Sequence, residues 1–78
     1  MKFSEWKRKV MLKLIQLATS ATTEKERQDL EALMNILHNL RYRDLASFLR
    51  YLYEYCRYHK RYDVCRELTQ EEIESDLF

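Results

Sequence analysis

The sequence of 78 residues contains neither glycine nor proline. At average usage, a chain of this length would hold about nine such residues. Glycine supplies the positive φ angles of tight hairpin turns, and proline pre-sets other turns. Their joint absence argues against a sheet protein. It also excludes the glycine-rich phosphate loops of Rossmann and P-loop nucleotide-binding enzymes.

Long apolar runs are also missing. The longest stretch without a charged residue covers residues 14–23 and ends in small and polar side chains. A membrane-spanning helix needs about 20 predominantly apolar residues, so we expect no membrane span. The N-terminal residues are basic, but no continuous apolar stretch follows them. We therefore expect no secretory signal peptide and a cytoplasmic protein.

The chain has only two cysteines, Cys56 and Cys65. This is too few for a disulfide framework, and in a reducing compartment we predict two free thiols. His59 lies one helical turn from Cys56, but structural zinc needs four ligands, usually in two close pairs, and the second pair is missing. We predict no metal, no cofactor and no cysteine catalysis, with Cys56 in the core. A thiol- or metal-dependent function is the weakest alternative.

Apolar residues recur at spacings of three and four along the chain, which predicts amphipathic helices. Hydrophobic residues make up 46% of the chain and charged residues 35%, a globular composition. We expect an all-α fold, a small helical bundle that forms a single domain of residues 1–78. Its three main helices are predicted at about 4–18, 23–39 and 44–62, and a short C-terminal helix at about 70–77.

The predicted helix starts depend on N-cap side chains, which accept hydrogen bonds from free backbone N–H groups. The candidates are Ser4, Thr23, Asp44 and Thr69. Thr23 and Thr69 are each followed three residues later by glutamate, which is the capping-box pattern. Leu68 before the last cap and Ile73 after it match a hydrophobic staple. Because no glycine is available, we predict that Asn39 takes the left-handed conformation after the second helix.

The net charge of +1 hides strongly charged segments. Residues 1–22 hold five basic side chains and one acidic, and residues 41–66 hold seven basic and three acidic. Residues 67–78 hold five acidic side chains and no basic one. The near-neutral total therefore hides two basic segments and an acidic end.

The helix predicted over 44–62 carries tyrosines on one flank of its apolar stripe and arginines on the other. All six tyrosines of the chain lie between Tyr42 and Tyr62. Tyrosine and arginine are enriched at protein interface hot spots, because they combine rigid contact area with polar groups. In the alternative interpretation, these tyrosines border a small core and the arginines are simply solvated. The predicted partner-binding residues are Arg50, Tyr51, Tyr55, Arg57, Tyr58, Arg61 and Tyr62.

These patterns predict a non-enzymatic binding protein, a small regulator, adaptor or inhibitor that acts through protein–protein contacts as a homodimer. The alternative is a nucleic-acid-binding protein, with a helix-turn-helix across the second and third helices as one form of it. The sequence pI of about 7.8 is low for that function. Its predicted binding residues are Lys7, Arg8, Lys9, Lys13, Arg57, Lys60 and Arg61.

Overall fold

A computed structural model describes the backbone of residues 2–74 and the side chains of residues 2–69. Within these residues there are four α-helices, one short 3-10 helix and no strand. The helices are α1 (Phe3–Ser20), α2 (Glu24–His38), η1 (Tyr42–Asp44), α3 (Leu45–His59) and α4 (Tyr62–Glu74). The all-α class and the small bundle are confirmed. The division into three main helices and one short helix is not, because α4 has 13 residues against 15 in α3.

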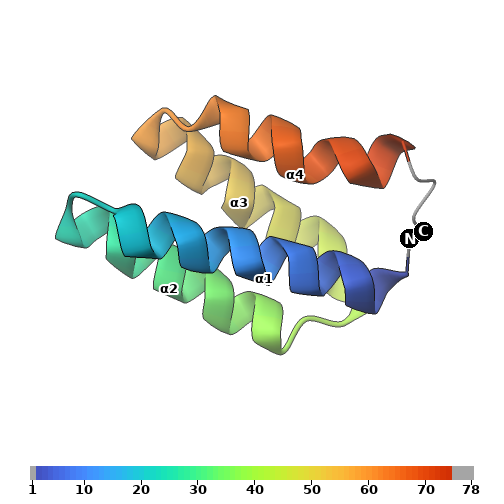
Figure 1. Ribbon diagram of the computed structural model, residues 1–78. Helices are drawn as coiled ribbons and strands as arrows, with labels where there is room; N and C mark the ends of the chain where they lie inside the picture. The colour runs from blue at the N-terminus through green and yellow to red at the C-terminus, as the bar shows by residue number, and fades with distance from the viewer. Residues whose placement is uncertain (1, 75–78) are drawn as a thin grey trace.

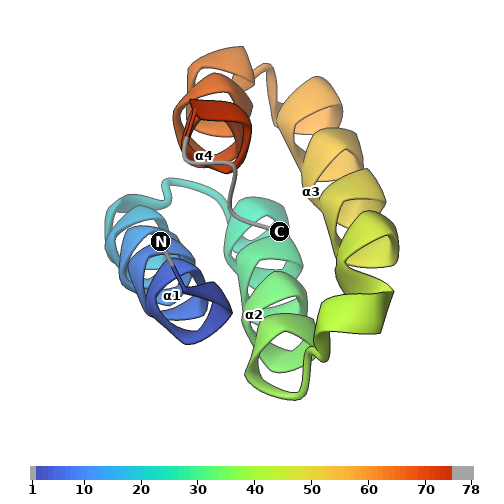
Figure 2. The same ribbon diagram turned by 90° about the vertical axis from the view of Figure 1, so that its right-hand side faces the viewer.

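The four helices run alternately in opposite directions, and each packs against the next along the chain (Figure 1). Seen along the bundle, α2 lies between α1 and α3, and α4 lies across from α2 (Figure 2). This arrangement surrounds one shared core. Helices α3 and α4, which are consecutive in sequence, also border a groove on the surface of the bundle.

The core is centred on Trp6, which has no exposed surface. Its ring packs edge-on against Phe48, with 6.0 Å between ring centroids, and its indole Nε1 donates a hydrogen bond to the Leu68 carbonyl at 3.4 Å. Trp6 therefore joins α1 to both α3 and α4. Other buried members of the core are Val10, Leu14, Leu30, Leu33, Leu37, Leu52 and Val64.

Helix α2 begins as the sequence predicts. The Thr23 hydroxyl accepts a hydrogen bond from the Glu26 backbone N–H at 3.2 Å, as expected of an N-cap. The prediction for the end of this helix is wrong, because Asn39 has a φ of −100° and is not left-handed. Its side-chain Nδ2 instead donates to the Asn35 carbonyl at 3.4 Å.

The limits of α1 also differ from the prediction. The helix begins at Phe3, with Lys2 and not Ser4 at the N-cap. It continues to Ser20, because the hydroxyls of Thr19 and Ser20 donate to backbone carbonyls one turn earlier. These hydroxyls favour a helix end in isolation, but here they bond back to the helix itself.

The third helix ends at His59, earlier than the predicted residue 62. Lys60 has a φ of 57°, the left-handed conformation, and among the described residues no other non-glycine residue has a positive φ. The Arg61 N–H donates to the Cys56 carbonyl at 2.8 Å, and the Lys60 N–H donates to the Arg57 carbonyl at 3.4 Å. These two bonds form a Schellman motif, which ends α3 and turns the chain back.

Helix α4 starts at Tyr62, well before the predicted residue 70. Thr69 lies inside this helix, and its hydroxyl donates to the Cys65 carbonyl at 2.6 Å. The prediction of Thr69 as an N-cap, with Glu72 closing a capping box, is therefore wrong. The predicted end of the helix at residue 77 and the Ile73 side chain of the predicted staple lie outside what the structure describes.

Lys60→Gly should raise the free energy of unfolding by about 1 kcal/mol, because the left-handed conformation penalises a residue with a Cβ atom. Urea denaturation measures the change. The matched control is Gln28→Gly in the exposed middle of α2, which should lower the free energy of unfolding by about 1 kcal/mol. Equal destabilisation by both substitutions would show that Lys60 is not left-handed in solution.

Candidate functional site

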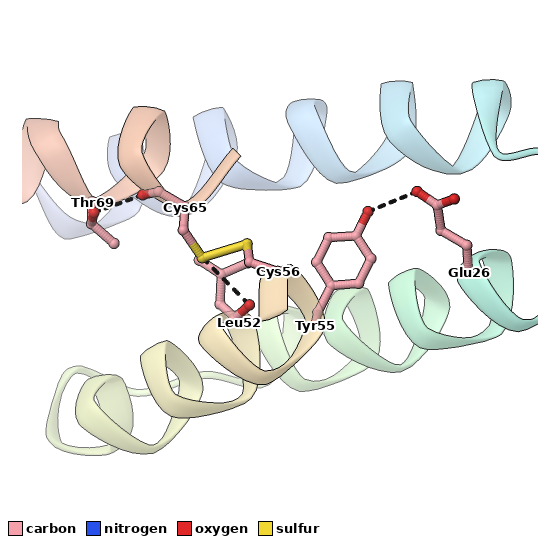
Figure 3. The surroundings of a disulfide bond; sticks show 6 residues. All are labelled: Glu26, Leu52, Tyr55, Cys56, Cys65 and Thr69. Carbon is pink, nitrogen blue, oxygen red and sulfur yellow. Dashed lines mark hydrogen bonds between the residues drawn. A yellow bond between two sulfur atoms is a disulfide. The ribbon is translucent and has the colours of Figure 1, made fainter. Parts of the chain in front are cut away.

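Two of the predicted binding residues, Tyr55 and Arg61, contact the buried carboxylate of Glu26. The Glu26 side chain on α2 is buried, and the Tyr55 hydroxyl donates to its Oε1 at 3.0 Å (Figure 3). Arg61 reaches the same oxygen from the turn after α3, with Nη2 at 3.1 Å. Burial, and then the bond to Glu26, raise the pKa of Tyr55 far above its ordinary value, so its hydroxyl stays protonated as a donor. Only 4% of Tyr55 is exposed, so a partner cannot reach it.

A second polar contact between α2 and α3 lies at His59. Its Nε2 is 2.7 Å from Asp29 Oδ2, and Lys25 Nζ is 3.1 Å from the other oxygen of that carboxylate. Burial works to raise the pKa of Asp29, but the hydrogen bonds from His59 and Lys25 outweigh it, so the pKa is lowered. His59 therefore serves as a partner of Asp29.

The prediction of free thiols is wrong, because Cys56 and Cys65 form a disulfide between α3 and α4 (Figure 3). Their Cα atoms are 6.3 Å apart, within the usual range for a disulfide. The turn at Lys60 brings them together. The cytoplasmic location, from which the free thiols were inferred, stays a prediction. Among the described residues, no group of three or more His, Cys, Asp or Glu side chains is placed to hold a metal ion.

The tyrosine flank of α3 lines a groove against α2 with a volume of about 270 Å³. Tyr51 and Tyr58 are exposed on one side of it, with Ile36 on the other. Lys25 Nζ lies over the Tyr58 ring, 5.7 Å from its centroid. Asp29 and Glu54 also line this groove, so it carries charges of both signs.

One residue of the predicted arginine flank, Arg57, lines a larger groove, of about 450 Å³, between α3 and α4. We call it the α3–α4 groove. Each of its walls carries one arginine and one exposed tyrosine. The disulfide and Thr69 complete the lining. Its lining residues are Tyr53, Cys56 and Arg57 from α3, and Tyr62, Cys65, Arg66 and Thr69 from α4.

The electrostatics of the α3–α4 groove differ from those of its neighbours, because none of its lining residues is acidic. A third groove, of about 220 Å³ between α1 and α4, contains Lys9 and Lys13 but also Glu67. The Arg66 side chain is exposed and makes no ion pair or hydrogen bond with any other described residue. Arg57 pairs with Glu54 at 2.9 Å, but both side chains are largely exposed. Such a pair contributes little to stability, so Arg57 can exchange it for another carboxylate.

The residues predicted for nucleic-acid binding do not form one surface. Lys7 donates to the Leu40 carbonyl at 2.9 Å, and Lys13 pairs with Glu67 at 3.2 Å. The start of α1 lies at the opposite end of the bundle from the end of α3 (Figure 1). The basic residues at the start of α1 are therefore far from those at the end of α3, whereas Lys13 lies in the second half of α1.

Of the four arginines and tyrosines that line the α3–α4 groove, two are absent from the predicted set, namely Tyr53 and Arg66. Tyr53 lies off the predicted tyrosine stripe, and Arg66 lies beyond the predicted end of that helix. One signal was present in the sequence: each cysteine is followed directly by an arginine, Arg57 after Cys56 and Arg66 after Cys65. Of the predicted set, the structure brings Arg57 and Tyr62 together in this groove and places Tyr51 and Tyr58 in the neighbouring one. Arg50 is exposed on α3 but lines neither groove.

Comparisons with protein-family models, with curated proteins and with solved structures found no match. Among the helices that the structure describes, none is both long enough and apolar enough to cross a membrane.

Tyr55→Phe should lower the free energy of unfolding by about 1–2 kcal/mol, because the substitution removes one donor from the buried Glu26 carboxylate. Tyr58→Phe is the matched control, since that tyrosine is exposed, and its change should stay within about 0.5 kcal/mol. Urea denaturation of both variants measures the difference. If Tyr55→Phe proves as stable as the control, the hydroxyl does not hold Glu26 in solution.

Proposed function

We propose that this chain is a small non-enzymatic binding protein that holds an acidic segment of a partner protein in the α3–α4 groove. Regulators, adaptors and inhibitors work in this way. The observation that supports the proposal is the composition of the groove: each wall offers one arginine and one tyrosine, and no lining side chain is acidic.

The two arginines give the groove its preference for carboxylates. An arginine side chain presents a planar set of N–H donors that matches a carboxylate. A glutamate or aspartate of the partner would pair with Arg66 and replace Glu54 as the partner of Arg57. A bound segment partly removes these ion pairs from water, so we expect each to contribute about 1 kcal/mol, the upper end for exposed pairs. Two such pairs in one groove favour an acidic segment over a neutral one.

The tyrosines and the disulfide supply the apolar part of the site. Tyr53 and Tyr62 are 53% and 57% exposed, and their rings stand on opposite walls of the groove. Tyrosine loses little side-chain entropy when it is fixed and covers a large area. We therefore propose that the bound segment places apolar side chains between its acidic ones, with the apolar residues against the tyrosine rings.

The double substitution Arg57→Gln with Arg66→Gln should weaken binding of an acidic peptide at least tenfold, because it removes two charge-assisted contacts. The probe is a fluorescein-labelled peptide of alternating glutamate and leucine, and fluorescence polarisation measures its affinity. The matched control replaces Arg8 and Arg43 with glutamine. Both are exposed and lie outside the groove, and the double changes the net charge equally.

Equal loss of affinity in the control double would overturn the proposal, because binding would then reflect net charge and not the groove. Binding of a DNA duplex that exceeds peptide binding, and that weakens more on loss of Arg8 than of Arg66, would favour the nucleic-acid alternative instead.

We also propose that the protein works as a homodimer whose copies meet at the tyrosine groove between α2 and α3. That groove carries Lys25 together with Asp29 and Glu54, so a two-fold arrangement allows opposite charges to meet beside Tyr51 and Tyr58. Light scattering at micromolar concentration should give the mass of a dimer. Tyr51→Lys should shift that mass toward the monomer, whereas Tyr53→Lys on the other flank should not. A monomer mass for the unsubstituted chain overturns this part of the proposal.

A further inference from the structure

The Cys56–Cys65 disulfide is built into the lining of the α3–α4 groove. Cys56 lies on the wall that carries Tyr53 and Arg57, and Cys65 lies on the opposite wall beside Arg66. The sulfur–sulfur bond links these two walls in addition to the main-chain turn at Lys60 (Figure 3). Any change in this bond therefore acts directly on the spacing of the proposed binding groups.

Besides its packing against α3, α4 is joined to the other helices by polar contacts. Leu68 accepts the Trp6 indole hydrogen bond, and Glu67 pairs with Lys13, so both contacts run to α1. Arg61, just before α4, reaches Glu26 on α2. If the disulfide opened, these contacts would keep α4 in the bundle while its position against α3 was released. The reduced chain is therefore expected to stay folded, with a looser groove.

A backbone carbonyl beside the disulfide can accept a hydrogen bond from the reduced Cys65 thiol. Cys65 Sγ lies 3.5 Å from the Leu52 carbonyl oxygen. In the disulfide this sulfur carries no hydrogen, but after reduction the thiol can donate to that carbonyl. The thiol of Cys65 would then have a partner in place.

We infer that the Cys56–Cys65 disulfide is a reversible, thiol-sensitive control on the α3–α4 groove: the disulfide form binds the acidic segment, and reduction by a dithiol weakens that binding. The inference rests on the proposed function. It assigns the two cysteines a role in control of binding and not only in stability.

The reduction is an ordinary thiol–disulfide exchange. A thiolate of the dithiol attacks one protein sulfur, the Cys56–Cys65 bond breaks, and the other cysteine leaves as a thiolate, which takes up a proton. The second thiol of the reductant then attacks the mixed disulfide, releases the first cysteine and closes the oxidised reductant. Two electrons and two protons pass to the protein. Arg57 and Arg66, each next in sequence to a cysteine, favour the departing thiolate.

A bound segment and the reductant compete for the same opening. Cys56 and Cys65 are 1% and 5% exposed, and the α3–α4 groove is the pocket that both cysteines line. A segment lying in the groove would cover the sulfurs and slow the attack. By linkage, a preference of the segment for the disulfide form makes the disulfide harder to reduce by the same factor.

The test compares the full chain before and after reduction by dithiothreitol, with the labelled glutamate–leucine peptide as probe. We expect affinity to fall at least fivefold on reduction, the lower end of typical coupling between sites. Reoxidation should restore it. Hydrogen exchange should rise in residues 62–69 and stay unchanged in α2. The Cys56→Ser with Cys65→Ser double should match the reduced chain, and saturating peptide should slow reduction of the disulfide.

Three results would overturn the inference. Equal affinity before and after reduction would show that the disulfide does not control the groove. Loss of helical circular dichroism on reduction would show that it is needed for the fold as a whole. No peptide binding in either state would instead refute the proposed function, and the control of binding with it.

Discussion

At Lys60 the backbone takes left-handed angles, and the chain turns back between α3 and α4. In an unbroken helix, residues nine apart have Cα atoms about 13.5 Å apart and point to opposite faces. The turn shortens that distance to 6.3 Å between Cys56 and Cys65. It also sets Tyr62 and Arg66 opposite Tyr53 and Arg57, so the disulfide and the groove both depend on it.

The turn is stabilised from both sides by contacts that are distant in sequence. Glu26, buried on α2, accepts hydrogen bonds from Tyr55 before the turn and from Arg61 after it. The Trp6 indole fixes the Leu68 carbonyl farther along α4. Because Glu26, Tyr55 and Trp6 are buried, loss of a partner leaves a costly unpaired group. Tyr55 and Arg61, which were predicted to bind a partner, therefore stabilise the turn and do not line the α3–α4 groove.

Features that depend on local residue spacing could be predicted from the sequence. The turn at Lys60, and the disulfide and groove that follow from it, could not. Helicity, the core position of Trp6 and the Thr23 cap follow from three- and four-residue spacing and from capping chemistry. The turn at Lys60 carries no such signal, because a lysine seldom replaces glycine in a left-handed position. Free thiols were predicted from the expected reducing compartment, and Cys65 lay beyond the helix predicted over 44–62, so no local pattern related the two cysteines. Thr69 matches the local pattern of an N-cap, but α4 begins at Tyr62, so Thr69 lies inside the helix.

The central claim is that the α3–α4 groove, with one arginine and one tyrosine on each wall, is the surface that binds. Chemical-shift mapping by NMR during titration with the glutamate–leucine peptide tests it most directly. The account predicts that the shifted resonances cluster at Tyr53, Arg57, Tyr62 and Arg66, with Tyr51 and Tyr58 unmoved. Shifts centred on the basic residues of α1, or spread evenly over the bundle, would contradict it.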